Sequence, residues 1–282
     1  MKLLVVAAVL LIASQVEAKI GSRITGGFSA RSGTIKCYVA LVIEGESTGV
    51  RTCGGCLIPR SPKFNGDRIL TSAGCLFTAA EGKAVTIKFF LGLSGPGGFQ
   101  TSMRINDVYK NVEFNPANNV SGGDIAQIIL EDRFSTSYSY CLEPSTPSAE
   151  SGDNAYVGER LFVCGHGNID NNKPGSRGLQ CTNLRVVNAA ECSAALQPNT
   201  KLPKGVICTR NNDASNVCGG DQGSPVFSNK TGELVLVGIV SFYPDSRGNA
   251  RCEDGHTAVI TQVGFHKSFV DDPTFLPPGA GK

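Results

Sequence analysis

Histidine and charged segments are scarce in this sequence, and both absences narrow its possible functions. The only histidines are His166, His256 and His266, and no two of them have the spacing of metal ligands. The net charge is +2 and no block of like charges occurs, so the composition gives no basis for a nucleic-acid partner or an anionic membrane. Internal repeats and low-complexity linkers are absent as well. We therefore expect no metal or other cofactor.

Long apolar runs are also missing, with one exception at the start of the chain. Met1 and Lys2 precede an unbroken apolar run from Leu3 to Ala13, which is too short to span a bilayer. The segment Val16–Ala18 then fits a small-residue cleavage site. We interpret residues 1–18 as a signal peptide, which predicts a secreted, extracellular protein that begins after this segment.

Cysteine, by contrast, is abundant, and its count is odd. Eleven cysteines are too many for ordinary core residues in a reducing compartment, whereas secretion lets them pair. Because the number is odd, at least one thiol must be free, blocked or bonded to another molecule. The sequence leaves both a buried free cysteine and a covalent partner open. In the secretory route the sequons at Asn119 and Asn229 also become acceptors for glycans.

Glycine (34 residues) and proline (14 residues) divide the chain into short segments. Helical periodicity is limited to Asn188–Leu196, with Asn188 as the N-cap, and to the stretch after Gly264. The other runs are β-branched or aliphatic and bounded by turn residues, which predicts an all-β sandwich or barrel. The end of the chain, residues 271–282, has the composition of a flexible tail. The predicted strands are Tyr38–Ile43, Ala84–Leu91, Ile125–Leu130, Leu161–Val163, Leu234–Ser241 and Thr257–Ile260.

Six short motifs follow one another along the chain. They are Arg23-Ile24-Thr25-Gly26-Gly27, Cys53-Gly54-Gly55-Cys56-Leu57-Ile58, Leu70-Thr71-Ser72-Ala73-Gly74-Cys75, Gly123-Asp124-Ile125-Ala126, Cys218-Gly219-Gly220-Asp221-Gln222-Gly223-Ser224-Pro225, and Val240-Ser241-Phe242-Tyr243 followed by Cys252. In this order they resemble the motifs of the trypsin-like (peptidase S1) serine protease family. The resemblance implies a short pro-segment over residues 19–23 and a protease homology domain over residues 24–270. It also implies two packed six-stranded antiparallel β-barrels, a short C-terminal helix and a cleft between the barrels.

The chemistry of that family requires a serine nucleophile, a histidine base and an aspartate that orients the histidine. Gly74 stands at the histidine position and Gln222 at the serine position, so that Asp124 alone is retained. Glycine has no side chain to accept a proton, and an amide is not a useful nucleophile. Ser224, two residues beyond Gln222, is expected to point away from the cleft, and none of the histidines matches a base position. The resemblance therefore predicts a pseudoprotease.

Other parts of the family's site are retained. Arg23 and Ile24 resemble the activation cleavage site of trypsin-like zymogens. Asp221 matches the aspartate that receives the new amino terminus as a buried ion pair. The sequence leaves two alternatives open, a usable activation switch or an inherited Asp221 with a site at Arg23-Ile24 that is never cut. The backbone amides of Gly220 and Gln222 match the donors of an oxyanion hole.

The substrate pocket, in contrast, has changed. Asn216 stands where the family's specificity residue lies, and because it is uncharged a basic anchor would lack its partner. Tyr243 replaces a glycine of the pocket wall and is expected to narrow the entrance. A peptide is still expected to fit as an added strand along Ser241 to Tyr243.

The resemblance also bears on the cysteines and on one glycan. It implies the disulfides Cys53–Cys75, Cys192–Cys208 and Cys218–Cys252, and it places Cys164 beside Cys181 on neighbouring strands. The pairing of Cys37, Cys56 and Cys141 stays open. Asn119 falls in a segment that overhangs the cleft in the family, where a glycan would hinder access of a substrate.

Three functions are consistent with these observations. The leading hypothesis is a non-catalytic homologue that binds a protein or peptide partner, such as an active protease or an inhibitor, as a regulator, cofactor or decoy. The alternatives are a weakly active serine endopeptidase and a secreted structural or storage protein.

Overall fold

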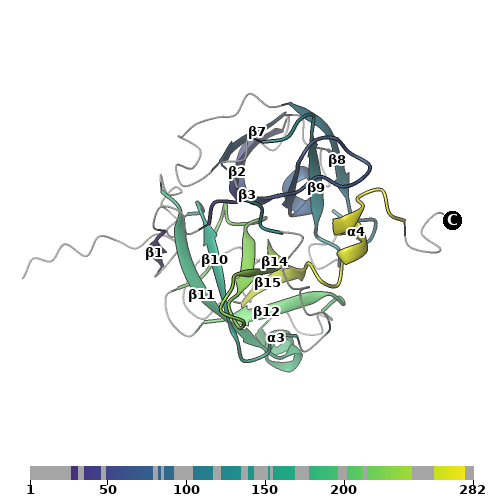
Figure 1. Ribbon diagram of the computed structural model, residues 1–282. Helices are drawn as coiled ribbons and strands as arrows, with labels where there is room; N and C mark the ends of the chain where they lie inside the picture. The colour runs from purple at the N-terminus through teal and green to yellow at the C-terminus, as the bar shows by residue number, and fades with distance from the viewer. Residues whose placement is uncertain are drawn as a thin grey trace, which may run out of the picture.

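The computed structural model shows two packed β-sheets and a few short helices (Figure 1). It describes residues 27–30, 35–45, 49–78, 82–83, 86–91, 104–116, 122–134, 139–142, 152, 155–168, 178–195, 202–211, 215–242 and 257–276. The predicted signal peptide and pro-segment lie outside these residues, as do Arg23, Ile24, Asn119, Tyr243, Cys252 and His256.

The first sheet contains six antiparallel strands in the order β7-β2-β3-β4-β9-β8. Strands β2 and β3 form a long hairpin whose register runs from the Tyr38–Cys56 pair to the Gly45–Gly49 pair. Within the described residues no ladder joins the outer strands β7 and β8, so this sheet is open. The strands are β2 (Tyr38–Gly45), β3 (Gly49–Ile58), β4 (Arg68–Thr71), β7 (Thr86–Leu91), β8 (Ile105–Lys110) and β9 (Ala126–Leu130).

The second sheet closes on itself. Its strand order is β1-β11-β10-β13-β14-β15-β12, and an additional pairing of Val186 with Thr209 joins β11 to β12. Six strands therefore form a ring, and the short β1 adds to the outside of β11. The strands are β1 (Phe28–Ser29), β10 (Arg160–Gly165), β11 (Gln180–Val187), β12 (Val206–Arg210), β13 (Pro225–Ser228), β14 (Val235–Phe242) and β15 (Thr257–Gln262).

The all-β prediction is thus confirmed, with one closed six-stranded barrel and a second sheet in place of two closed barrels. All six predicted strands are present, and each differs from its predicted bounds by at most two residues at either end. Hydrophobic runs bounded by turn residues identified them because most of their side chains are buried in one of the two sheets. A separate two-stranded ladder pairs β5 (Phe77–Thr78) with β6 (Gly82–Lys83).

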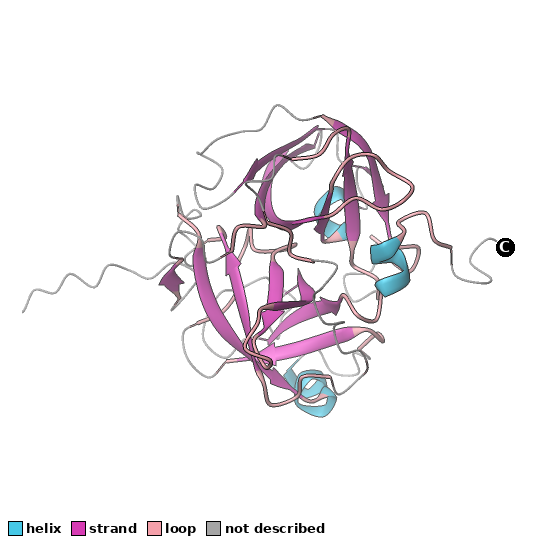
Figure 2. Cartoon of the chain, viewed as in Figure 1, coloured by secondary structure: helices cyan, strands magenta, loops and turns pink. Residues whose placement is uncertain are grey.

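Both predicted helices are present (Figure 2). In α3 (Ala189–Ala195) the Asn188 side chain accepts from the backbone N–H of Glu191 at 2.9 Å and donates to its carboxylate, a reciprocal cap at the helix start. The segment after Gly264 forms α4 (Lys267–Asp271). The sequence reasoning missed α2 (Ala73–Leu76), because four residues are too few to show helical periodicity.

The C-terminal helix α4 is tied to the first sheet through its last carbonyls. The guanidinium of Arg68 donates to the carbonyl of Val270 at 2.6 Å, and the Gln127 amide donates to that of Phe269 at 2.6 Å. These bonds satisfy groups that have no partner within the helix. The chain then continues through Asp272, which pairs with Lys63 at 2.6 Å, and residues 277–282 lie outside the described part.

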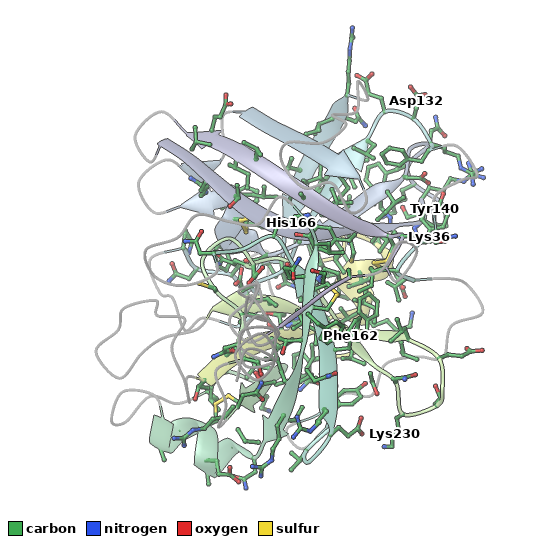
Figure 3. The ribbon with its side chains drawn as sticks, turned by 90° about the vertical axis from the view of Figure 1, so that its left-hand side faces the viewer. Lys36, Asp132, Tyr140, Phe162, His166 and Lys230 are labelled. Carbon is green, nitrogen blue, oxygen red and sulfur yellow. A yellow bond between two sulfur atoms is a disulfide. The ribbon has the colours of Figure 1, made fainter. Side chains whose placement is uncertain are left out.

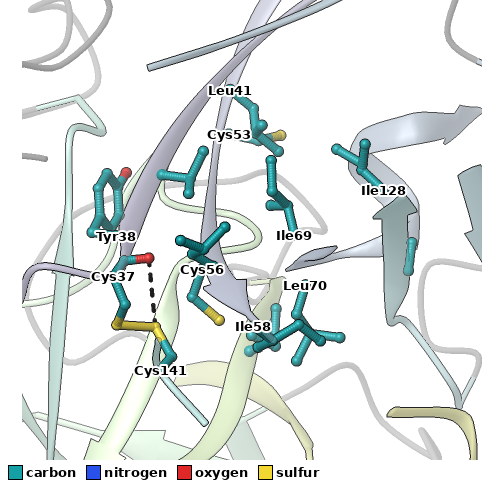
Figure 4. Packing of buried hydrophobic residues seen from close by; sticks show 14 of the residues in the cluster. Cys37, Tyr38, Leu41, Cys53, Cys56, Ile58, Ile69, Leu70, Ile128 and Cys141 are labelled. Carbon is teal, nitrogen blue, oxygen red and sulfur yellow. Dashed lines mark hydrogen bonds between the residues drawn. A yellow bond between two sulfur atoms is a disulfide. The ribbon is translucent and has the colours of Figure 1, made fainter. Parts of the chain in front are cut away.

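The largest apolar core fills the first sheet and extends across to the second. Figure 4 shows Leu41, Ile69 and Ile128 directed into it from β2, β4 and β9. Phe227 and Leu236 of the closed barrel belong to the same cluster. The two sheets therefore share buried apolar surface, which holds the loops between them in a fixed relation.

Disulfides reinforce this arrangement. Cys53–Cys75 and Cys192–Cys208 form as the resemblance implied, and Cys164–Cys181 bridges directly paired residues of β10 and β11. The structure adds a pairing that the sequence left open, Cys37–Cys141 (Figure 4). Cys218 is also disulfide-bonded. Several disulfides place the protein in an oxidising, extracellular environment.

The free cysteine is Cys56, which is fully buried in the core beside Leu70 (Figure 4). Burial raises the pKa of its thiol far above the usual value, so the reactive thiolate is not populated at neutral pH. The sequence left open whether the unpaired cysteine is a buried free thiol or is bonded to another molecule, and the structure favours the buried free thiol.

We expect the native protein to resist thiol reagents and to run as a monomer on a non-reducing gel. A maleimide should label about one thiol per chain only after denaturation without reductant, because Cys56 must first leave the core. A Cys56→Ala variant provides the matched control and should take up no label. Rapid labelling of the native wild-type protein would contradict this burial.

Candidate functional site

The site is built around the Asp124 carboxylate, which lies just before β9 where the two sheets meet. It is only 6% exposed and accepts three hydrogen bonds. The Ser72 hydroxyl donates to Oδ1 at 2.7 Å, and the backbone N–H of Gly74 donates to the same oxygen at 2.8 Å. The Ser241 hydroxyl donates to Oδ2 at 2.5 Å. Among the described residues no cation pairs with this carboxylate, and its hydrogen bonds stabilise it in the buried site.

Ser72 and Gly74 reach Asp124 because β4 ends at Thr71 and a short helix starts immediately afterwards. Ser72 is the N-cap of α2, with extended backbone, and its Oγ accepts from the Gly74 N–H at 3.1 Å. The Cys53–Cys75 disulfide fastens this helix to β3. The turn is thus held from both sides, and Ser72 is fully buried within it.

Gln222 comes to the same place from the other sheet. Its backbone carbonyl accepts from the Gly54 N–H at 2.7 Å, which fixes the loop before β13 against β3. Its side-chain Nε2 donates to Ser72 Oγ at 3.2 Å. A β-carbon built on Gly74 would lie 2.7 Å from that Nε2, so the Gln222 amide occupies the space beside Gly74.

These contacts form a continuous chain of hydrogen bonds from Gln222 through Ser72 and Asp124 to Ser241. Ser72 and Asp124 belong to the first sheet and its connections, whereas Gln222 and Ser241 belong to the second. The structure therefore brings together the sequence-predicted residues Gly74, Asp124, Gln222 and Ser241. Sequence reasoning missed Ser72, although a serine where the family motif has alanine was a usable signal.

The loop that carries Gln222 also contains backbone donors. Gly220 has φ +94°, a conformation that glycine adopts without strain. Among the described residues, neither the N–H of Gly220 nor that of Gln222 donates to a protein acceptor. Ser224, two residues further, is fully buried against Gly54 and Gly165, which confirms that it does not face the cleft.

Asp221 is the second buried carboxylate of this region and is completely enclosed. Among the described residues its partners are two backbone donors, the N–H of Gly167 to Oδ1 and the N–H of Cys218 to Oδ2, both at 2.8 Å. Burial raises the pKa of Asp221 from 3.8 to about 7, and these two bonds only partly oppose the shift. The phenol of Tyr38 borders the same space, and its pKa is raised first by burial and then by the neighbouring negative charge of Asp221.

The remaining predicted residues lie at the edges of the site. Asn216 is buried, and its Oδ1 accepts from the Val217 N–H at 2.9 Å. His166 lies where the two sheets meet (Figure 3), with its ring 5.2 Å from the ring of Tyr38. Burial lowers the pKa of His266 to about 4, and its Nδ1 lies 3.4 Å from the Asn111 amide.

The described residues contain neither a cluster of metal ligands nor a helix that could span a membrane. In the described part of the chain no three histidine, cysteine or acidic side chains gather as metal ligands. The helices described there are all too short or too polar to cross a bilayer.

We expect Gln222→Ala to lower the free energy of unfolding by about 1 kcal/mol, because it removes a partly buried hydrogen bond between the sheets. The matched variant Gln222→Glu keeps the shape but replaces the N–H donor with a second carboxylate next to Asp124. The free energy of unfolding that Gln222→Glu loses should be larger at pH 7 than at pH 4, because the two carboxylates repel each other only when both are ionised. Urea denaturation at both pH values measures this, and equal effects of Gln222→Glu at the two values would contradict it.

Comparisons with known proteins agree with the fold and the order of motifs. The chain is 24% identical over 255 residues to Serine protease 1 of Drosophila melanogaster, covering 90% of this chain and 87% of that protein. It is 27% identical over 232 residues to chymotrypsin-C of Mus musculus, covering 81% of each. The solved structure of HL collagenase matches with a TM-score of 0.68 at 22% identity, covering 90% of this chain and 100% of that one, which supports the fold alone. The Trypsin family model matches residues 24–265, and the chain therefore belongs to the trypsin family of serine protease homologues.

Proposed function

We propose that this protein is a secreted, non-catalytic serine protease homologue that acts by binding a protein or peptide partner. The observation that carries the proposal is the set of groups around the Asp124 carboxylate. Gly74 and Gln222 supply neither a base nor a nucleophile there, and the two hydroxyls bonded to the carboxylate, those of Ser72 and Ser241, are both buried.

Acyl transfer in this family needs a hydroxyl whose proton passes to an imidazole held by the aspartate. Without the imidazole, a serine hydroxyl near pH 7 is a poor nucleophile. Loss of one triad member leaves about 10³–10⁴-fold catalysis over water from the remaining groups. Loss of both the base and the nucleophile removes the acyl-enzyme route itself. A binding function is therefore favoured for this chain over weak endopeptidase activity.

The other candidate groups give the same answer. Ser224 is buried and directed at Gly54, away from the carboxylate. The ring of His166 packs on the ring of Tyr38. His266 lies at the start of α4, and its ring contacts the Asn111 side chain. Among the described residues the donors to the Asp124 carboxylate are Ser72, Gly74 and Ser241, and none of them is a histidine.

The features of the site that favour a binding function do not depend on catalytic side chains. The N–H groups of Gly220 and Gln222, which have no acceptor among the described residues, would donate to a carbonyl or carboxylate oxygen of a bound chain. Ser241 lies on β14 next to the expected peptide position, and the uncharged Asn216 replaces a charged pocket base. Partners that fit such a cleft are an extended segment of an inhibitor or of an active protease, bound as an added strand.

The buried Asp221 supports a retained activation switch. Cleavage after Arg23 would create a free ammonium group on Ile24, and a cation is the partner that the enclosed carboxylate lacks among the described residues. Pairing a buried charge in this way is worth on the order of 3–5 kcal/mol relative to the half-broken pair. The protein would then have two states, before and after cleavage, with different cleft loops.

Secretion follows in the proposal from the predicted signal peptide together with the disulfides. Asn229 is exposed at the turn between β13 and β14, where the sequon is accessible to the glycosylation machinery. Asn119 lies outside the described residues, and its glycan near the cleft stays a prediction.

A fluorophosphonate probe tests the loss of catalysis. We expect no covalent labelling of the secreted protein, before or after cleavage at Arg23, under conditions that label an active trypsin-family protease in the same tube. A Gln222→Ser variant should also stay unlabelled, because it restores a hydroxyl but no base. Labelling of the wild-type protein that stops when the protein is denatured would overturn the proposal. Capture of a defined inhibitor or protease from the native fluid would separate a binding function from a storage role.

The pH dependence of stability tests the switch. The folded-state pKa of Asp221 lies above its unfolded value, so this group favours the fold at low pH, and its contribution is lost as the pH rises from about 4 through about 7. Each unit of raised pKa corresponds to about 1.4 kcal/mol. Uncleaved protein should therefore lose more stability between pH 4 and pH 8 than an Asp221→Asn variant.

After cleavage at Arg23 the Ile24 ammonium would pair with Asp221 and this loss should shrink. Unfolding measured by urea at both pH values, with the amino terminus identified by sequencing, decides the matter. An uncleaved start at Lys19 in the secreted protein, or an unchanged pH profile after cleavage, would exclude the switch.

A further inference from the structure

We propose that the outer face of the closed barrel over β10 and β11 binds an acidic segment of a partner protein. Arginines from three neighbouring strands lie there beside two aromatic rings that reach the surface. The inference goes beyond the proposed function, because it concerns a second surface and does not depend on the groups around Asp124. We call this surface the arginine face, and its residues are Phe28, Arg160, Phe162, Asn183, Arg185 and Arg210.

The strand register places two of the arginines directly opposite each other. Arg160 of β10 pairs with Arg185 of β11, and both residues are exposed. Opposite residues of an antiparallel ladder direct their side chains to the same face of the sheet, and like charges in such a pair lower the stability of the fold. The pairing of these two cations is therefore not explained by the stability of the barrel.

A third arginine extends the row onto β12. Val186 of β11 pairs with Thr209 of β12. One residue further in this register, the exposed Arg210 lies beside Arg185. The Asn211 side chain joins the two strands at this point, because it accepts from the backbone N–H of Arg185 at 2.9 Å. Since neighbouring strands lie about 4.8 Å apart, the three arginine positions span about 10 Å across the sheet.

The carboxylate that adjoins this row in the sequence is already engaged elsewhere. Glu159 precedes Arg160, but its carboxylate pairs with Lys230 at 3.2 Å and accepts from the Ser228 hydroxyl at 3.1 Å. Within the described ranges the guanidinium groups of Arg160 and Arg185 take part in no ion pair or hydrogen bond. Carboxylates of another molecule would therefore complement the charge of this face.

The aromatic rings indicate which class of polyanion fits. Phe162 lies two residues from Arg160 on the same face of β10, on the side of the barrel that Figure 3 turns toward the viewer. The ring of Phe28 stacks on it with 6.1 Å between the ring centroids, and Phe28 is 50% exposed. Aromatic residues and arginine are enriched in protein interfaces and among the residues that contribute most to affinity. A sulfated polysaccharide would pair with the arginines but would leave the rings without an apolar partner.

The arginine face and the site around Asp124 are reached by opposite ends of β10. This strand ends at Gly165, which packs against the Asp221 carboxylate, whereas Arg160 begins it. Five residues of extended strand separate the two ends by about 16 Å. Binding at the arginine face can therefore be measured independently of the cleft.

The probe for the test is a fluorescent peptide in which runs of glutamate flank one phenylalanine, and fluorescence anisotropy measures its affinity. We expect Arg160→Gln/Arg185→Gln to weaken binding about tenfold, because two exposed ion pairs with the peptide are lost. The matched control Arg60→Gln/Arg104→Gln removes the same charge from exposed positions beside the first sheet, and should bind as the wild type does. Equal affinities of the wild type and of Arg160→Gln/Arg185→Gln, or no measurable binding to the wild type, would overturn the proposal.

Urea denaturation separates a lost contact from damage to the barrel. The midpoint of Arg160→Gln/Arg185→Gln should be unchanged or higher, because the substitution removes a repulsion between like charges.

The aromatic contribution is tested with Phe28→Ala and with a second peptide that carries alanine in place of phenylalanine. Phe28→Ala should weaken binding of the first peptide and leave binding of the second unchanged, whereas the exposed Leu276→Ala should affect neither. If Phe28→Ala binds both peptides as the wild type does, the preference for a protein segment is wrong.

Two further measurements distinguish other occupants of the arginine face. Heparin serves as the sulfated polysaccharide, and binding of heparin without binding of the peptide would replace the proposed partner by a carbohydrate. The sequon at Asn229 follows β13, the strand next to β10, so a glycan there would border the row of arginines. Peptide binding that appears only in an Asn229→Gln variant would show that the glycan covers this face, and would overturn the proposal for the glycosylated protein.

Discussion

The Asp124 carboxylate must be satisfied where the two sheets meet, and the rest of the site is arranged around that requirement. A buried charge without partners costs several kcal/mol. Three donors, Ser72, Gly74 and Ser241, meet it. Because Ser72 and Gly74 lie at the start of α2 and Ser241 lies on β14, the same bonds that stabilise the charge also join the first sheet to the closed barrel.

Satisfying the carboxylate internally has a consequence for function. Catalytic sites keep groups poised for a substrate and often lose stability for that reason. Here the Gln222 amide bonds to Ser72 and Ser72 bonds to Asp124, so these polar groups are used within the protein. The hydrogen-bonded chain then acts as a structural connection, whereas the N–H groups of Gly220 and Gln222 have no acceptor among the described residues and are the donors in the proposed binding function.

The second buried carboxylate, Asp221, presents the opposite case. It has two backbone donors and no cation among the described residues, so its charged form is poorly supported and its pKa is raised. The two aspartates lie close in the fold but differ in how fully their charge is balanced. The proposed regulation belongs to Asp221 for this reason, whereas Asp124 serves the permanent connection.

Local sequence signals predicted the regular elements well. Alternating turn residues and apolar runs identified the strands, and Asn188 marked the start of α3, because burial and capping depend on neighbours in the chain. The paired cysteines of β10 and β11 followed from the implied hairpin. The bridge between Cys37 and Cys141 did not, since a connection over 104 residues has no local signal. Helix α2 was also missed, because its four residues are too few to show helical periodicity.

The sequence by itself determined the fold class, the family and the residue types at the site, including the glycine and glutamine beside Asp124. Only the tertiary structure decided what those residues do to one another. Whether the Gln222 amide points into solvent or toward Gly74, and whether Ser72 caps a helix or also holds Asp124, depends on packing between the two sheets. Hydrogen bonds between groups distant in sequence are set by that packing, and no neighbour in the chain encodes them.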